Sequence, residues 1–417
     1  MKNAGSTVQI EVDALRVGMY VHLDVGWMSH PFPLSSFRIA SAEQIRIIHS
    51  LGLKTVRWSP DHGASADTPA APPAAPVEAE TPEAAARRER RAAAAVQRAA
   101  LVHCERQFAE ATREARQICD SVAAQPEPAR DKALALTRAL VDKMMGQGEL
   151  CIRLLTEGAG DKASAHAINV TLISLLMGRG FGLAESEMMD LGVGALLHDI
   201  GKLDLPQRVR HREEHFSAAE ARFYEEHVAH GVAQAQRMQL SPGATAVIAQ
   251  HHEHADGSGF PLKLGSERMS TAARIVALID RYDILCNPAA PGKALTPHEA
   301  LSLLFAQSQG RFDAAILGAF IRMMGVYPPG SVVQLTDDRF ALVTAVNSTR
   351  PLKPRVTVHD PRLAPEEAPS LDLEHTPNLG IRRSIRPGAL PRDALATLAP
   401  RARVVCFFEP IREDMAE

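Results

Sequence analysis

The amino-acid sequence predicts a mainly α protein, in which an all-helical central domain lies between a small α+β module and a β-rich C-terminal appendage. Three observations support this prediction. Residues 148–325 repeat apolar side chains at helical spacings and contain no convincing strand. Residues 7–59 combine strand-like alternation with one helical run. Residues 326–417 contain short strand-like runs that are separated by turns.

The composition narrows the class of function. The 417 residues are 46% hydrophobic, which is ample for several packed domains. A net charge of −3 and only 5% aromatic residues argue against binding of nucleic-acid polymers. The five cysteines are scattered, the N-terminus leads into no apolar signal sequence, and no uncharged apolar stretch reaches ~18 residues. We therefore expect a cytoplasmic protein without a transmembrane segment.

The N-terminal module is expected to span residues 1–59. Residues 8–12 alternate as in a strand, and Ser41 with Gln44 three positions later marks the start of a helix. Residues 60–84 are rich in Pro and Ala and lack the apolar side chains of a core, which predicts a semi-extended linker.

Residues 85–147 are expected to form a helical segment. Its apolar residues alternate at spacings of three and four, as in the seam of a coiled coil: Leu101, Cys104, Phe108, Ala111, Ala115, Ile118 and Val122. Two interpretations fit this pattern. The seam joins two chains in a homodimer through residues 85–124, or it packs against residues 128–146 of its own chain as a helical hairpin.

The C-terminal appendage, residues 326–417, contains four strand-like runs, at residues 332–335, 340–346, 355–358 and 403–408. Turns containing Asp, Asn and Pro separate the first three runs. The pattern predicts a small β-rich structure and does not indicate what that structure binds.

The chemically informative residues begin at residues 195–202, Ala-Leu-Leu-His-Asp-Ile-Gly-Lys. An apolar helical run ends there in His198 and Asp199, and Gly201 suits the left-handed turn that commonly ends a helix. A buried imidazole and carboxylate are costly unless something binds or pairs with them, and a metal ion does both. A satisfied core His beside a helix-terminal Asp is the alternative that this doublet alone leaves open.

Further His and Asp residues stand in comparable settings. Residues 251–261, His-His-Glu-His-Ala-Asp-Gly-Ser-Gly-Phe-Pro, carry three His and two acids around a Gly/Pro turn. His166 opens an apolar helical stretch, and His227 starts the run His-Val-Ala-His-Gly. Asp280 follows the apolar run of residues 275–279. Together with the His-Asp doublet, these residues form an ordered series of motifs.

In this order the motifs resemble those of the HD-GYP family, the branch of the HD superfamily that is associated with hydrolysis of cyclic di-GMP. The family pattern is H-x-x-N-V, H-D-I-G-K, H-x-x-x-G, H-H-E-R-x-D-G-x-G-Y-P and A-R-I-x-x-x-x-D-x-Y-D. This sequence matches from residue 166 to residue 283, with His in place of the Arg and Phe in place of the Tyr of the fourth motif. The resemblance implies a metal-dependent phosphohydrolase domain over residues 148–325. Residues 1–59 resemble the accessory domain often found ahead of HD-GYP domains.

By this resemblance seven residues are metal ligands: His166, His198, Asp199, His227, His251, His252 and Asp280. Five imidazoles and two carboxylates without a thiolate suit iron or manganese, with zinc as the alternative. Seven ligands exceed the needs of one ion, so we expect two divalent ions. The resemblance implies that Asp199 bridges them, with His166, His198 and Asp280 around one ion and the remaining three His around the other.

The resemblance also implies residues that contact the substrate. Lys202 is placed to steady phosphate charge or to assist the leaving oxygen, so Lys202 and Asp199 are the expected catalytic residues. The other expected substrate contacts are Arg274, Lys293, Asp256, Gly257, Gly259, Phe260 and Pro261.

Two departures from the family pattern bear on these expectations. Some members hold a third ion with a Glu four residues before the first His, and this chain has Lys162 there. The D-R-P-Y-R segment of the family is replaced by Pro-Ala-Ala-Pro-Gly at residues 288–292. Two Arg that can reach substrate phosphate are therefore missing, and Ala and Gly cannot replace their paired hydrogen bonds.

Two functions of different class follow. The first is a metal-dependent phosphodiesterase that hydrolyses cyclic di-GMP, or another cyclic dinucleotide, to linear pGpG and onward to GMP. The second is a module of weak or no catalytic activity that binds a cyclic dinucleotide or a signalling partner such as a diguanylate cyclase. The complete ligand set favours the enzyme, and the missing Arg pair favours the module.

Overall fold

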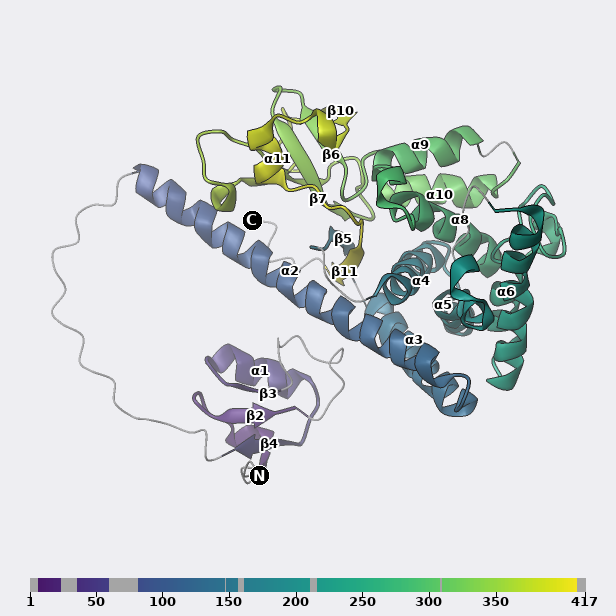
Figure 1. Ribbon diagram of the computed structural model, residues 1–417. Helices are drawn as coiled ribbons and strands as arrows, with labels where there is room; N and C mark the ends of the chain where they lie inside the picture. Colours follow the sequence, from purple (N-terminus) through teal and green to yellow (C-terminus); the bar gives the residue numbers. More distant parts are fainter. Residues whose placement is uncertain are drawn as a thin grey trace. The chain divides into compact units, whose positions relative to one another are not determined.

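The computed structural model describes residues 7–23, 36–59, 82–146, 148–156, 161–210, 216–307 and 310–410. The chain divides into two compact units, Met1–Arg87 and Arg88–Glu417 (Figure 1). Most of the predicted linker, residues 60–81, lies outside the described residues. The prediction of a mainly α protein with β structure in its N-terminal and C-terminal regions is confirmed.

The N-terminal unit contains a four-stranded antiparallel sheet in the order β1-β4-β2-β3. Its elements are β1 (Val8–Glu11), β2 (Tyr20–His22), β3 (Ser36–Arg38), α1 (Ala42–Ser50) and β4 (Thr55–Ser59). The helix begins where the sequence predicts, because the Ser41 side chain accepts a hydrogen bond from the backbone N–H of Gln44. Strands and helix enclose a common apolar core, as expected for an α+β module.

Helix α2 (Pro82–Ser121) belongs largely to the second unit and is followed by α3 (Pro126–Met145). The apolar seam is buried within the chain from Cys104 in α2 to Val122, the residue that follows this helix. Phe108 of this seam meets Phe407 of the C-terminal sheet edge to face, with ring centroids 6.5 Å apart. Part of the seam thus packs against the C-terminal sheet, a partner that neither interpretation named, and the homodimer through residues 85–124 stays a prediction.

The described part of residues 161–324 is built from α-helices. They are α4 (Lys162–Gly180), α5 (Glu185–Leu197), α6 (Ala218–Arg237), α7 (Pro242–Gln250), α8 (Thr271–Cys286), α9 (Pro297–Gln307) and α10 (Ala314–Met324). Helices α4 and α5 are apolar on most faces, the pattern of helices that neighbours surround. Accordingly, α4 packs against α5 and α8, while α5 also packs against α3 and α7.

The second unit also contains a seven-stranded antiparallel sheet. Its strands are β5 (Leu150–Leu154), β6 (Val332–Leu335), β7 (Phe340–Asn347), β8 (Arg355–Val358), β9 (Ser370–Asp372), β10 (Ile381–Ile385) and β11 (Cys406–Pro410), and helix α11 (Arg392–Leu398) precedes the last strand. Each of the four strand-like runs predicted in the C-terminal appendage overlaps one of these strands.

Strand β5 corrects the expectation that residues 148–325 contain no strand. It pairs with β7 on one side and with β11 on the other. All five of its residues are buried, so its sequence, Leu-Cys-Ile-Arg-Leu, does not show the clean alternation of a half-exposed strand. Helices α4 to α10 are thus inserted in the chain between two strands of one sheet.

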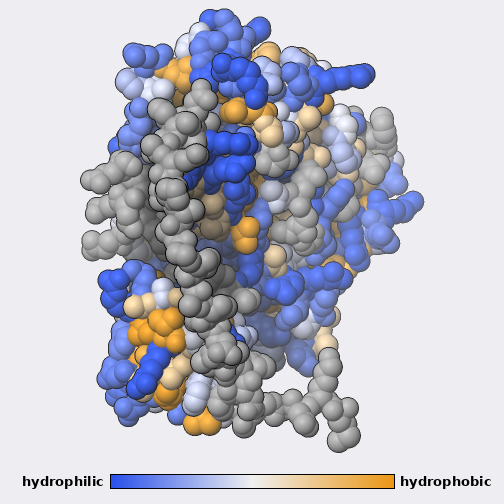
Figure 2. Space-filling model, turned by 90° about the vertical axis from the view of Figure 1, so that its left-hand side faces the viewer, coloured by the Kyte–Doolittle hydropathy of each residue, from blue (hydrophilic) through white to orange (hydrophobic). Residues whose placement is uncertain are grey.

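None of the helices in the described ranges has the length and hydrophobicity that crossing a bilayer requires. Figure 2 shows a face of the molecule on which hydrophilic side chains predominate and hydrophobic ones form small separate groups.

Candidate metal centre

His198 and Asp199 lie where helix α5 ends, as predicted. His198 is fully buried at the C-cap position. Gly201 is not in the left-handed conformation that the sequence suggested. Instead, a side chain at Gly201 would collide with the backbone of His227. Glycine is needed because α6 passes very close to the chain at this point, and this close approach brings His227 to the His-Asp doublet.

Three histidines of the cluster share one arrangement. The Nδ1 atoms of His198, His227 and His251 lie 2.5–2.8 Å from the carbonyl oxygen of the residue three positions earlier. A carbonyl oxygen can only accept a hydrogen bond, so each Nδ1 carries the proton and each Nε2 keeps its lone pair. The local backbone therefore fixes each imidazole with an unprotonated Nε2, the form in which a histidine can bind a metal ion.

His166 is oriented by a side chain instead. Its Nδ1 lies 2.6 Å from Oδ2 of Asp283, a buried carboxylate on α8. The other oxygen of Asp283 accepts hydrogen bonds from the side-chain amides of Asn169 and Asn287. A carboxylate that accepts the Nδ1 proton leaves the Nε2 lone pair of His166 free and makes it more basic.

The same two amides connect this carboxylate to the C-terminal sheet. Asn169 Oδ1 accepts the backbone N–H of Cys406 in β11 at 3.2 Å. Asn287 donates to the carbonyl oxygen of Val404 at 2.8 Å and accepts the N–H of the same residue at 2.8 Å. The surroundings of His166 are thus partly built from a strand 237 residues away from Asn169 in the sequence.

The free ring nitrogens meet the carboxylates in two groups that share Asp199. In the first group, His166 Nε2 lies 3.2 Å from His198 Nε2 and 3.2 Å from Asp280 Oδ1. The Oδ2 atom of Asp199 lies 3.5 Å from His198 Nε2 and 3.8 Å from His166 Nε2.

The second group lies on the other oxygen of the same carboxylate. Asp199 Oδ1 lies 3.8 Å from His227 Nε2 and 3.7 Å from His251 Nε2. His252 completes this group, with one potential donor atom of each of the four residues within 4.8 Å of the others. The structure therefore brings all seven predicted ligands together. Asp280 also approaches the second group, since its Oδ2 atom lies 3.9 Å from His252 Nδ1.

This cluster fits metal ions. Asp199 Oδ1, Asp280 Oδ1 and His252 Nε2 are buried and have no hydrogen-bond partner among the described residues. Buried polar atoms without a partner are costly, and a bound cation removes that cost for those that coordinate it. Imidazole nitrogens and carboxylate oxygens without a thiolate suit divalent transition metals.

The two groups differ in their electrostatics. Burial disfavours the charged form of His166, but Asp280 and Asp283 outweigh it and raise the pKa of His166 to about 10. Without an ion, the Nε2 atom of His166 therefore carries a proton near neutral pH, and a metal ion would have to displace that proton. Burial lowers the pKa of His227 to about 3, against the opposing effect of Asp199. The surroundings of His166 are thus the more negatively charged, because Asp280 of the first group and the neighbouring Asp283 both face its ring.

Lys202 lies beside the shared carboxylate. Its Nζ donates a hydrogen bond to Asp199 Oδ2 at 2.6 Å and lies over the ring of Tyr224, 5.3 Å from the centroid. Although burial opposes both charges, Lys202 holds the pKa of Asp199 well below its usual value, and Asp199 raises the pKa of Lys202. The positively charged ammonium group of Lys202 is therefore held at the edge of the cluster.

The other two predicted cations are placed differently. Arg274 forms an ion pair with Asp313, the N-cap of α10, at 2.5 Å, so its guanidinium is engaged within the helical core. Lys293 is exposed in a short 3-10 helix after α8. The Nζ of Lys162 lies 3.5 Å from the carbonyl oxygen of Ala289, which places the altered segment beside the first turn of α4.

The loop of residues 253–261 packs against the second group of imidazoles. The buried carboxylate of Glu253 accepts backbone N–H groups from two residues beyond the loop, at 2.6 and 2.9 Å. A side chain at the buried Gly259 would collide with the backbone of residues 252–254. The ring of Phe260 lies 4.7 Å from the ring of His252, so the loop forms one wall of the cluster.

The remaining loop residues predicted to contact substrate lie farther out. Asp256 and Pro261 are exposed, and Asp256 accepts the backbone N–H of Ser258 at 2.9 Å. Gly257 has a φ of +74°, in the left-handed region that favours glycine.

Several residues of the site were not among the sequence predictions. Asn169 and Asp283 belong to matched motifs, so their place in the pattern was an available signal. Glu253 was likewise part of the His-His-Glu motif. Nothing local marks Asn287 or its partner Val404, because the hydrogen bonds join positions that are far apart in the chain.

Comparison with known proteins finds two matching family models and several curated relatives. A family model described as HD domain matches residues 96–316, more than half of the chain, and a domain of unknown function, DUF3391, matches residues 7–133. The cyclic di-GMP phosphodiesterase PA4108 of Pseudomonas aeruginosa is 28% identical over 357 residues, 84% of each chain. The cyclic di-GMP phosphodiesterase response regulator RpfG of Xanthomonas campestris pv. campestris is 30% identical over 207 residues, 48% of this chain and 54% of the relative.

Among solved structures, Bd1817, an HDG"Y"P protein from Bdellovibrio bacteriovorus, matches with a TM-score of 0.42 at 16% identity. The match covers 76% of this chain and 98% of that protein.

Proposed function

The chain belongs to the HD domain family, and from this premise we propose that it hydrolyses cyclic di-GMP with two metal ions held by the His/Asp cluster. The observation that carries the proposal is the position of Asp199, which presents one oxygen to each of two groups of imidazoles. Curated relatives named cyclic di-GMP phosphodiesterases support the choice of substrate.

The donor set indicates which ions suit the site. His166, His198 and Asp280 would hold one ion, the second group would hold the other, and Asp199 would bridge them. Imidazole and carboxylate donors favour iron or manganese, with zinc as the alternative. When bound, such ions supply Lewis-acid polarisation of a phosphate oxygen and lower the pKa of a coordinated water.

The reaction is the addition of water to one phosphodiester bond. The water oxygen bonds to phosphorus, the bond from phosphorus to the 3′ oxygen of the sugar breaks, and that oxygen takes up a proton. The product is linear pGpG. Lys202, held beside Asp199, supplies a fixed positive charge for the phosphate or the leaving oxygen. Phe260 and its loop form the wall against which the dinucleotide would lie.

The test is metal analysis and turnover on the same anaerobically purified full-length protein. We expect close to two transition ions per chain and conversion of cyclic di-GMP to pGpG that is lost on chelation and restored by iron or manganese. Lys202→Ala should lower the turnover number while both ions stay bound. Protein that stays free of metal after reconstitution would end the dinuclear proposal.

The segment at residues 288–292 allows a second test. Each missing Arg–phosphate hydrogen bond is worth roughly 1.5–3 kcal/mol, so the wild type should have a high Michaelis constant. The double variant Ala289→Arg with Gly292→Arg should lower that constant at least tenfold and change turnover only a few-fold. Turnover absent from both proteins, with the metal site full, would replace the enzyme by a module that only binds the dinucleotide.

A further inference from the structure

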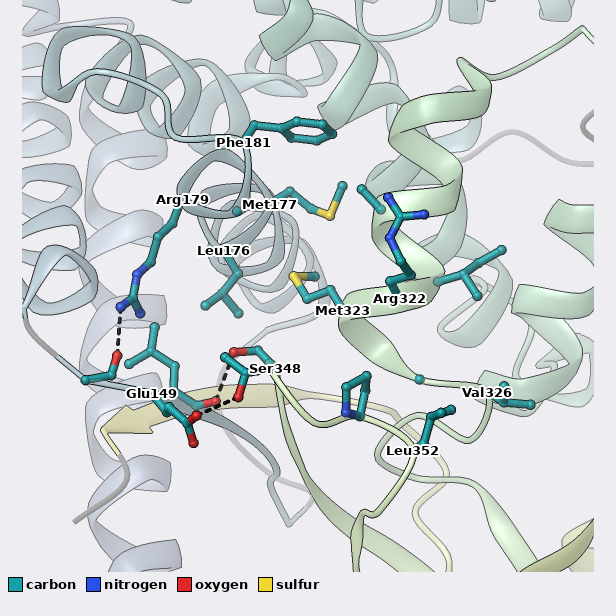
Figure 3. A pocket seen from close by; sticks show the side chains of 18 residues that line it. Glu149, Leu176, Met177, Arg179, Phe181, Arg322, Met323, Val326, Ser348 and Leu352 are labelled. Atoms are coloured by element: carbon teal, nitrogen blue, oxygen red, sulfur yellow. Dashed lines mark hydrogen bonds between the residues drawn. The ribbon is translucent and has the colours of Figure 1, made fainter. Parts of the chain in front are cut away.

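A pocket of about 780 Å³ lies between the helical core and the C-terminal sheet. It is lined by the ends of α4 and α10, the start of β5 and the turn after β7. Small-molecule sites commonly have volumes of ~300–1,000 Å³ and mainly apolar walls. Figure 3 shows Met177 and Met323 in the middle of this pocket, between Phe181 and Ser348.

The pocket is separate from the His/Asp cluster. Helix α4 carries His166 near its beginning and Leu176 and Met177 near its end. At 1.5 Å per residue, the ten residues from His166 to Leu176 span ~15 Å along the helix axis. A ligand in this pocket would therefore not contact the predicted metal ligands.

Two cationic side chains line the pocket, Arg179 and Arg322, and they differ in how their guanidinium groups are engaged. Glu149 is neutralised, because it accepts hydrogen bonds from Asn347, Thr349 and Arg350. Arg179 donates to the carbonyl oxygen of Gly148 at 2.7 Å. Arg322 lies exposed in the last turn of α10 and makes no hydrogen bond or ion pair with any residue that the structure describes.

The rim of the pocket is unusually apolar for an exposed surface. Phe181, Val326 and Leu352 line it, with exposed fractions of 40%, 44% and 74%. Grouped exposed apolar side chains around a concave site commonly mark a binding surface. An apolar interior with a free guanidinium at its edge is complementary to a molecule with an apolar body and one negative group.

We infer that this pocket binds an amphipathic monoanion, such as a medium-chain carboxylate. The apolar chain occupies the space beside Leu176, Met177 and Met323, and the carboxylate pairs with Arg322 at the rim. The guanidinium offers two parallel N–H groups to a carboxylate, which fixes the head group more firmly than a point charge would. This is a second small-molecule site, and it does not depend on the proposed hydrolysis.

The test is calorimetric titration of the full-length protein with decanoate, below its micelle-forming concentration. Decyltrimethylammonium, which has the same chain length and the opposite charge, is the matched ligand control. We expect one decanoate per chain and much weaker binding of the cation. Arg322→Gln should weaken decanoate at least tenfold, as loss of a charged hydrogen bond predicts, while Arg322→Lys should retain most of the affinity.

A blocking variant tests the position of the ligand. Ala319 lines the pocket, and Ala315 is exposed one turn earlier on α10 and does not line it. Ala319→Trp should abolish decanoate binding, and Ala315→Trp should leave it unchanged, with circular dichroism reporting the fold of both. Failure of the wild type to bind decanoate, equal binding of both ligands, or binding unaffected by Arg322→Gln would overturn the inference.

Discussion

The histidines of the His/Asp cluster are oriented by two different means. His198, His227 and His251 rest on carbonyl oxygens of their own local backbone. His166 rests on the carboxylate of Asp283, which is itself held by side-chain amides that reach the C-terminal sheet. The first arrangement forms as soon as the helices form. The second requires tertiary structure from a distant part of the chain.

This difference indicates which half of the cluster, meaning the ligands around one ion, is more easily weakened by substitution. A backbone acceptor cannot be removed by substitution, so the orientation of three imidazoles is protected against most mutations. The orientation of His166 depends on side chains that can each be replaced. We therefore expect the ion held by His166, His198 and Asp280 to be the more sensitive of the two.

Replacing Asp199, the residue common to both halves, should have the largest effect on metal content and turnover. Asp199→Ala takes one oxygen from each group, so we expect loss of at least one ion and of all detectable turnover. Asp204→Ala is the matched control, since Asp204 lies five residues on and bonds Gln234 instead of the cluster. Metal content and turnover measured on both variants test whether the two halves share Asp199. An Asp199→Ala protein with two ions and normal turnover would show that the halves do not share this carboxylate.

Removing the orienting carboxylate should affect one half only. Asp283→Ala leaves the Nδ1 of His166 without its acceptor, and loss of such a partner typically costs 10- to 100-fold in metal affinity. Metal titration should therefore show one weakened ion and one unchanged ion per chain. Asp283→Asn, which still offers an oxygen, should fall between Asp283→Ala and the wild type. Equal weakening of both ions would contradict the division into two halves.

The smallest effect on metal binding is expected from removing Asn287, whose side chain connects Asp283 to the backbone of Val404. Asn287→Ala removes hydrogen bonds to Asp283 and to Val404, which should lower the unfolding free energy by about 1–3 kcal/mol. It should also weaken the His166 ion a few-fold. Asn347→Ala, which removes an amide of the same sheet that bonds Glu149, is the control for stability alone. Metal affinity lowered to the same extent by both variants would remove the special role of Asn287.

The residues that carry local signals were predictable from the sequence. The helices and the capping pair Ser41 and Gln44 follow from spacing, and the expected grouping of the seven candidate ligands follows from the resemblance of the motifs to a known family. Gly201 was assigned the wrong cause, because a close approach of another helix leaves no mark in the neighbouring residues. Strand β5 was missed for a similar reason. Burial on both faces removes the alternation by which strands are recognised, and its partners lie about 190 or more residues later.

The position of β5 in the chain has a consequence for synthesis on the ribosome. This strand emerges before helices α4 to α10, but its neighbours β7 and β11 emerge only after all of them. Both of its edges therefore remain unpaired while the whole helical core is being made. Unpaired strand edges are prone to association with other chains, and pairing across such long separations is slow. The nascent chain thus passes through a period in which its most buried strand is exposed, and that period closes only when β11 has been translated.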